Sequence, residues 1–203
     1  MSAICCTALL LPTTSEVNAA DSASAKTAKQ AKSKTAEQGK TALSDETKSV
    51  ENAYFAAGCF WKVQYIFSKV PGVIATKAGY TGGKTENPNY GQVCSHTTGH
   101  AETVRVEFDP KKVSYKKLLE VFWSHHDPTT LNRQGPDIGD QYRSEVFYAN
   151  AAQKEEAQNY LAELQKSRKF SSPIVTKLEP IGQFYDAEEY HQDYFKKHGQ
   201  SCD

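Results

Sequence analysis

Three side chains of this sequence have the types needed for redox chemistry at sulfur: Cys59, Glu102 and Cys202. A cysteine thiolate is a nucleophile, and a cysteine oxidised to a sulfenic acid needs a second thiol that resolves it to a disulfide. A carboxylic acid that stays protonated can donate a proton to a leaving oxygen. Each has a plainer alternative. Cys59 can be a small core residue, Glu102 a strand-end carboxylate that reaches water or an arginine, and Cys202 an exposed terminal thiol.

The element that positions Cys59 is a strand-to-helix turn. Residues 53–56 are apolar and predict a short buried strand, and apolar residues recur at helical spacing from 60 to 70. Gly58 marks the turn, so Cys59 falls at the helix N-terminus. Unpaired N–H groups and the positive end of the helix dipole favour a thiolate there. We therefore expect Cys59 to have a lowered pKa, assisted by Lys62 one turn into the helix.

The element that positions Glu102 is an alternating strand. Val104, Val106 and Phe108 share one face, and Glu102 is in phase with them. This parity places a carboxyl group at the entrance to the core. Desolvation there should raise its pKa and keep it protonated.

Further capping signals predict three more helices. Ser114 can cap one helix, and Asn150 with Gln153 starts another. A last helix is expected to begin at Asp186 and Glu189 and to end before the C-terminal tail that carries Cys202.

The order of the elements sets the fold class. Strand, helix, strand, strand, helix and strand follow one another and begin as a split βαβ pattern, so we expect an α/β (α+β) domain with two layers and a mixed sheet. Residues 129–141 form an irregular run, and long loops in compact domains are more often functional than idle.

Composition separates the N-terminal part of the chain from the rest. All 11 Tyr, 9 Phe and 2 Trp of the 203 residues lie at or after Tyr54. We expect a targeting segment at 1–20, a disordered tether rich in Ala, Lys, Ser and Thr at 21–50, and one globular domain at 51–203. A solvated helix is the alternative for the tether. The 24 basic and 24 acidic side chains give no reason to expect a nucleic-acid partner.

Two other groups of residues invite a metal-site interpretation. They are Cys94, His96 and His100, and the run His125-His126-Asp127. Neither has the paired spacing of a zinc site. We expect the histidines to bond loop backbones or face water, and Cys94 to be a structural or incidental thiol.

Four motifs occur in an order that resembles a known family. They are Gly58-Cys59-Phe60-Trp61, Gly79-Tyr80-Thr81-Gly82-Gly83, Gly99-His100-Ala101-Glu102 and Gln141-Tyr142-Arg143-Ser144. Together with a C-terminal cysteine they are similar to the A-type peptide methionine sulfoxide reductases, which act on the S epimer. The resemblance runs from about residue 54 to 202 and implies a two-layer sandwich on a ferredoxin-like plan.

The resemblance also implies a role for each matching residue. Cys59 would attack the sulfoxide sulfur as a thiolate, Glu102 would protonate its oxygen, and Cys202 would form a Cys59–Cys202 disulfide that thioredoxin reduces. The substrate-binding matches are Phe60 and Trp61 around the substrate methyl group, Tyr90 and Tyr142 on the oxygen, and Asp137 at the substrate backbone. No metal or organic cofactor is implied. Oxidised proteins, peptides and methionine sulfoxide are the expected substrates.

The sequence departs from the family pattern near the candidate nucleophile. Lys62 and Gln64 stand where the family commonly has Gly and Glu, which should lower the Cys59 pKa further. His96 replaces a usual glycine. With Cys202 as the single cysteine near the C-terminus, we expect thioredoxin to attack the disulfide directly unless Cys94 takes part.

Other classes of function remain open on the residues alone. A thiol peroxidase would also use one reactive cysteine. A peptide-binding module would keep its function after Cys59→Ser, and a zinc-binding structural protein would contain stoichiometric zinc. We expect a monomer. The N-terminal segment favours export, with a cytoplasmic or organellar location as the alternative.

Overall fold

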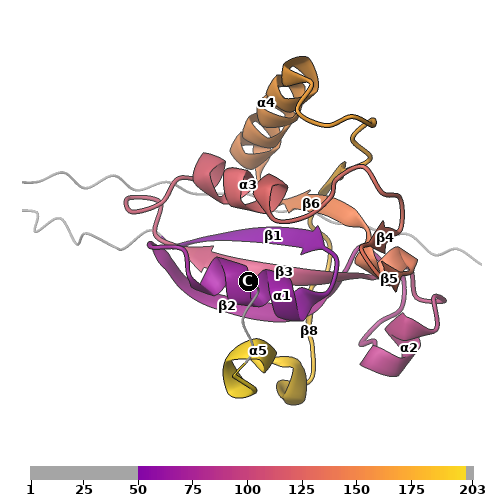
Figure 1. The fold of residues 1–203 in the computed structure, drawn as a ribbon. Coiled ribbons are helices and arrows are strands. Elements are labelled where there is room, and N and C mark those ends of the chain that lie inside the picture. Colours follow the sequence, from indigo (N-terminus) through magenta and orange to yellow (C-terminus); the bar gives the residue numbers. More distant parts are fainter. Residues whose placement is uncertain (1–49, 200–203) are drawn as a thin grey trace, which may run out of the picture. The chain divides into compact units, whose positions relative to one another are not determined.

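A six-stranded mixed sheet forms the centre of the computed structural model, which describes residues 50–199 (Figure 1). Its strands are β1 (Glu51–Ala57), β2 (Val73–Thr81), β3 (Ala101–Phe108), β6 (Ser144–Tyr148), β7 (Lys177–Pro180) and β8 (Tyr185–Asp186), and a separate hairpin pairs β4 (Arg133–Gln134) with β5 (Asp137–Ile138). The sheet order is β7-β6-β1-β3-β2-β8, in which β6 and β7 are parallel and the other neighbours are antiparallel. The order β6-β1-β3-β2 is that of the expected ferredoxin-like plan, so the predicted fold class is confirmed.

The helices are α1 (Phe60–Ser68), α2 (Tyr90–Cys94), α3 (Tyr115–Ser124), α4 (Ala151–Ser167) and α5 (Tyr194–Lys197), with 3-10 turns η1 (Asp140–Tyr142) and η2 (Glu189–His191). Helices α3 and α4 begin where the predicted capping residues Ser114 and Asn150 indicate. The Ser114 hydroxyl accepts a hydrogen bond from the Lys117 N–H at 3.2 Å, and the Asn150 side chain accepts one from the Gln153 N–H at 2.9 Å. Each satisfies an N–H that a helix start leaves unpaired. No helix in residues 50–199 is long and apolar enough to cross a membrane.

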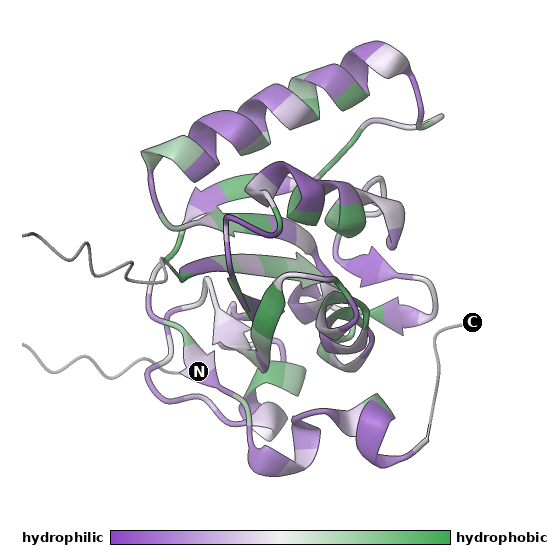
Figure 2. Ribbon diagram, turned by 90° about the vertical axis from the view of Figure 1, so that its left-hand side faces the viewer, coloured by the Kyte–Doolittle hydropathy of each residue, from purple (hydrophilic) through white to green (hydrophobic). Residues whose placement is uncertain are grey.

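The main core lies between the sheet and helices α1, α3 and α4. Phe55 of β1 stacks on Phe67 of α1 with ring centroids 4.8 Å apart and on Phe122 of α3 at 5.4 Å. All three rings are buried, and burial of each contributes about 1.5–3 kcal/mol. Figure 2 shows the hydrophobic strands at the centre, with much of α4 hydrophilic. Glu102 shares the core face of β3, as the alternation predicts.

The opposite face of the sheet is covered by an extended segment, residues 181–187. Phe184 in this segment contacts the ring of Tyr54 at 5.6 Å and lies under the Arg105 guanidinium at 5.2 Å. The same segment pairs with β2 through β8. From there the chain passes directly into η2 and α5, which packs against α1 (Figure 1).

The prediction of one helix starting at Asp186 is wrong. Asp186 lies in β8, η2 is a single turn, and α5 begins only at Tyr194. The physical reason is a set of long-range bonds: the Gln192 side chain accepts from the Ala78 N–H at 3.0 Å and donates to the Ala78 carbonyl at 2.9 Å. These bonds hold the segment extended beside β2, and Asp193 has a φ of +51°, so no helix can run through.

Two loops contain more structure than the sequence indicated. The turns expected at residues 87–91 lead into α2. Asn89 and Gln92 cap the N-terminus of this helix with a reciprocal capping box. The irregular run 129–141 contains the β4–β5 hairpin and the start of η1. The predicted segments 1–20 and 21–50 lie outside the described residues, except for Val50, and so does Cys202.

Candidate active site

Cys59 lies at the N-terminus of α1, as predicted. Gly58 has a φ of +89°, and a Cβ there would come within 2.7 Å of the Gln134 side chain, so a glycine is needed for both the turn and the close approach. Cys59 is the N-cap residue, and its carbonyl accepts the Val63 N–H at 3.3 Å. The side chain is a half-buried free thiol.

The predicted lowering of the Cys59 pKa is wrong. Burial, followed by the negative charge of Glu102, raises the pKa of this thiol to about 12. The N–H groups of Trp61 and Lys62 act in the predicted direction, but burial outweighs them. In the resting site Cys59 therefore holds its proton at neutral pH.

Glu102 is buried, with 1% of its surface exposed, and points at the start of α1. One of its carboxyl oxygens, Oε2, accepts the Phe60 N–H at 3.0 Å. Burial raises its pKa from the ordinary 4.5 to about 8, the bond from Phe60 opposes the rise, and the charge of Asp137 adds to it. The carboxyl is thus a protonated acid at neutral pH, in agreement with the expectation from strand parity. Its hydrogen-bond partner, Phe60, directly follows Cys59 in the chain.

Two phenols and one carboxylate come from separate loops to the same place. Tyr142 ends η1, Tyr90 begins α2, and Asp137 lies on β5. The charge of Asp137 raises the pKa values of Cys59, Glu102 and Tyr142. Burial and then the charge of Glu102 raise the pKa of Tyr142 to about 12, and burial raises that of Tyr90 as well. Both phenols therefore keep their protons and can donate hydrogen bonds.

The aromatic pair after Cys59 is held from behind. Phe60 is buried, and the half-buried Trp61 donates its indole N–H to Nδ1 of His191 at 3.0 Å. The Trp61 ring also stacks in parallel on Tyr194 with centroids 3.8 Å apart. The His191 ring also lies 4.4 Å from the Tyr90 ring. Accepting from Trp61 at Nδ1 places the proton of a neutral His191 on Nε2.

Residues of the C-terminal segment support the site, and the sequence analysis missed them. Glu188 accepts the Tyr80 hydroxyl and the Tyr90 N–H, each at 2.9 Å, and so links β2 to α2. His191 supports Trp61 as described above. The local sequence offers one sign of this role, a cluster of polar and aromatic residues within residues 186–198, where the pattern predicts a single helix.

Gln64 belongs to the same support and does not act on the thiol. Its buried amide donates to the Thr76 carbonyl and to Gln192 Oε1, both at 3.2 Å, and accepts the Asp193 N–H at 2.8 Å. Lys62 is exposed. The hypothesis that these two residues lower the Cys59 pKa is therefore not supported by where they lie.

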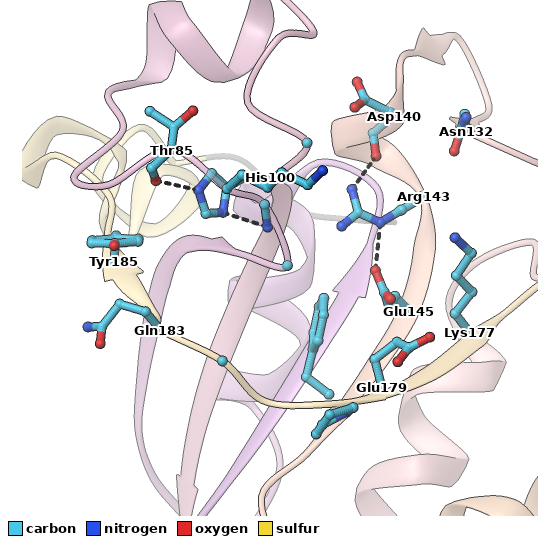
Figure 3. A pocket seen from close by; sticks show the side chains of 17 residues that line it. Thr85, His100, Asn132, Asp140, Arg143, Glu145, Lys177, Glu179, Gln183 and Tyr185 are labelled. Atoms are coloured by element: carbon cyan, nitrogen blue, oxygen red, sulfur yellow. Dashed lines mark hydrogen bonds and ion pairs between the residues drawn. The ribbon is translucent and has the colours of Figure 1, made fainter. Parts of the chain in front are cut away.

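A separate polar cavity of about 590 Å³ is lined by His100, Asp140 and Arg143 among others (Figure 3), and its lining does not include Cys59 or Glu102. Arg143 crosses it, donating to Glu145 at 2.6 Å and to the Asp140 carbonyl at 2.9 Å. His100 accepts the Gly83 N–H at 3.0 Å and donates to a loop carbonyl. These bonds hold the backbone on both sides of Tyr142 and two residues before Glu102, so the cavity wall helps to position the site.

The histidines considered as metal ligands have other bonds. His125 and His126 bond the carbonyls of Val121 and Phe122, at 2.7 and 2.8 Å, and His96 pairs with Asp140 at 3.1 Å. No group of three or more His, Cys, Asp or Glu side chains in residues 50–199 is arranged to hold a metal ion.

Comparison with known proteins decides the family. The family model described as peptide methionine sulfoxide reductase matches residues 51–203. The chain belongs to this family. It is 58% identical over 152 residues to a peptide methionine sulfoxide reductase MsrA of Methanosarcina acetivorans, which covers 75% of this chain and 81% of that one. The resemblance seen in the four motifs is thus confirmed, and so is its implication that the chain is an oxidoreductase.

Two solved structures of Mxr1 share the fold. Reduced Mxr1 from Saccharomyces cerevisiae superposes with a TM-score of 0.71 at 36% identity, covering 78% of this chain and 91% of that one. Mxr1 in complex with Trx2 superposes with a TM-score of 0.53 at 27% identity, covering 76% and 91%.

Proposed function

We propose that this enzyme reduces the S epimer of methionine sulfoxide in oxidised proteins and peptides, and as the free amino acid. The observation that carries the proposal is the neutral Glu102 carboxyl, bonded to the Phe60 N–H next to the thiol of Cys59. A sulfoxide oxygen becomes a leaving group only if it is protonated, and a carboxylic acid that keeps its proton at pH 7 can supply that proton.

The groups around Cys59 fit a sulfoxide. The oxygen would accept hydrogen bonds from Glu102, Tyr90 and Tyr142, all of which hold protons at neutral pH. The methyl group would lie against Phe60 and Trp61, which offer apolar surface and no free donor for the oxygen, because the Trp61 indole N–H is donated to His191. This fixes which way round the sulfoxide binds, and Asp137 would hold the substrate backbone at the rim.

The first half-reaction balances within the site. The Cys59 sulfur bonds the sulfoxide sulfur while the oxygen takes the proton of Glu102. The S–O bond and the new S–S bond then both break: the oxygen passes with its proton to the Cys59 sulfur as a sulfenic acid, and methionine leaves as the thioether. The proton that Cys59 loses on attack returns the Glu102 carboxylate to its acid form.

The second half-reaction needs a further thiol. The Cys202 thiol would attack the sulfenic acid, forming the Cys59–Cys202 disulfide and releasing water. Thioredoxin would then reduce this disulfide by direct thiol–disulfide exchange. The relative Mxr1 forms a complex with Trx2, which supports a thioredoxin partner for this chain.

The remaining proposals concern the whole chain. We propose that residues 51–203 act as a monomeric reductase domain behind a targeting segment at 1–20 and a tether at 21–50, and that the chain is exported. Fractionation of cells that express the full chain would test export against the cytoplasmic or organellar alternative.

The decisive experiment is turnover of separated S and R methionine sulfoxide peptides with dithiothreitol as the reductant. Consumption of S alone supports the proposal, and consumption of neither refutes it. Cys59→Ser should abolish the reaction. Cys202→Ser should still release one methionine per enzyme in a single turnover, because the first half-reaction needs Cys59 and no resolving thiol.

A further inference from the structure

Tyr190 is exposed beside the site without being part of it. Five large apolar or aromatic side chains in residues 50–199 are exposed: Val50, Ile74, Leu131, Ile138 and Tyr190. Tyr190 is the aromatic one, with 60% of its surface exposed. His191, the next residue, contacts three aromatic side chains of the site, so the exposed Tyr190 ring has a candidate partner in a substrate that extends beyond that site.

The ring of Tyr190 is separated from the methyl-binding aromatics by one buried ring. Tyr190 contacts His191 with ring centroids 4.2 Å apart. The buried His191 in turn lies 5.1 Å from Phe60, 5.6 Å from Trp61 and 4.4 Å from Tyr90. The charge of Glu188, which holds the Tyr90 N–H, also acts on the Tyr190 hydroxyl. Tyr190 thus extends the aromatic surface of the site out to solvent.

The hairpin on the loop that carries Asp137 does not offer a comparable surface. Asp137 pairs with Gln134, and Gln134 lies against Gly58, so this pair faces the site. Ile138 pairs with Arg133, and residues paired across a hairpin share a face. Ile138 therefore lies on the outer face, away from Cys59.

We propose that Tyr190 is a specificity-determining residue that stacks against a side chain next to the sulfoxide in a polypeptide substrate. This inference rests on the proposed function and adds to it a preference for polypeptides with an apolar or aromatic residue next to the sulfoxide. Such a residue can bury its surface against an aromatic ring. Tyrosine offers a large, stiff surface to such a neighbour at little entropic cost. Free methionine sulfoxide has no neighbour to place there.

The test compares three substrates with dithiothreitol as the reductant. They are free methionine-S-sulfoxide, a peptide with the sulfoxide between Leu and Phe, and the same peptide with Gly and Ser as neighbours. Tyr190→Ser should lower kcat/KM for the Leu/Phe peptide by about fivefold to tenfold, the range expected for loss of one aromatic contact. It should leave the other two substrates within about twofold of the wild type.

Two variants serve as controls. Tyr190→Phe keeps the ring and should behave as the wild type on all three substrates. Ile74→Ser alters an exposed side chain at the far end of β2, where Val73 pairs with Phe108, and should also have no effect.

Two results would overturn the inference. Equal losses on all three substrates would mean that Tyr190 merely supports the pocket through His191, and no loss on any would mean that it contacts no substrate. A wild-type enzyme that reduces none of the three would instead refute the proposed function.

Discussion

Replacing Glu102 by Gln should make the protein more stable and much less active. The buried carboxyl of Glu102 keeps its proton in the folded protein up to a pKa of about 8, whereas in the unfolded chain it loses the proton near 4.5. Between these values unfolding releases a proton, so folded-state stability falls as the pH rises. Glutamine carries no charge, and its Oε1 can still accept the Phe60 N–H that Glu102 accepts at 3.0 Å.

The size of the effect follows from the two pKa values. Stability falls by about 1.4 kcal/mol for each pH unit within this window. A pH of 7 lies some 2.5 units above the ordinary pKa of 4.5. At pH 7 the ionisation of Glu102 in the unfolded chain therefore lowers the unfolding free energy by about 3 kcal/mol. Below pH 4.5 both states hold the proton and the difference vanishes. The Glu102→Gln variant should therefore exceed the unfolding free energy of the wild type by only about 0.4 kcal/mol at pH 4.5 and by about 3 kcal/mol at pH 7.

The assay is urea unfolding at several values between pH 4.5 and 8, on the wild type and on Glu102→Gln. Glu155→Gln, which alters an exposed carboxyl on α4, is the matched control and should show no growing gap. A gap that is the same at every pH, or a variant less stable than the wild type at pH 7, would refute the inference that burial keeps Glu102 neutral. Sulfoxide reduction by Glu102→Gln should fall by about 10²–10⁴-fold, the usual contribution of a general acid.

Three other outcomes follow from the structure. In the wild type, kcat/KM should stay level up to about pH 8 and then fall tenfold per unit as Glu102 loses its proton; a rise to pH 8 followed by a plateau would mean that the reactive site holds one proton fewer. Gly58→Ala should destabilise the fold by about 1–3 kcal/mol in urea unfolding because its φ is +89°, whereas Gly182→Ala, with nothing within 4 Å of the added methyl, should not. Gln64→Ala removes three hydrogen bonds and should lower the unfolding free energy by about 1–3 kcal/mol; an unchanged urea midpoint would show that these bonds do not anchor the C-terminal segment.

The parts of the site that local pattern controls could be predicted from the sequence. A glycine before a helix start places Cys59, and strand alternation places Glu102 on the core face with its raised pKa. The two-layer class with a mixed sheet also followed from the split βαβ pattern, which permits few arrangements, whereas the ferredoxin-like plan came from the family resemblance.

The Cys59 pKa could not be predicted in the same way. The N–H groups that lower it are local to α1, but the burial that raises it depends on every element that closes over the thiol. The same limit explains the missed Glu188 and Gln192. Their bonds to Tyr90 and Ala78 join residues 98 and 114 positions apart, and no periodicity within residues 186–198 records such partners. The helix signal there was real but weaker than these long-range bonds.

The segment that closes the second face of the sheet also completes the site, and this sets when the enzyme can become active during synthesis. Phe184 covers the sheet, and within a few residues Glu188 and His191 hold Tyr90 and Trp61 in place. A nascent chain that has not yet released these residues from the ribosome already contains Cys59, but it lacks the supports that shape the pocket. The active enzyme therefore emerges only after residues 181–191 have left the ribosome and joined the sheet.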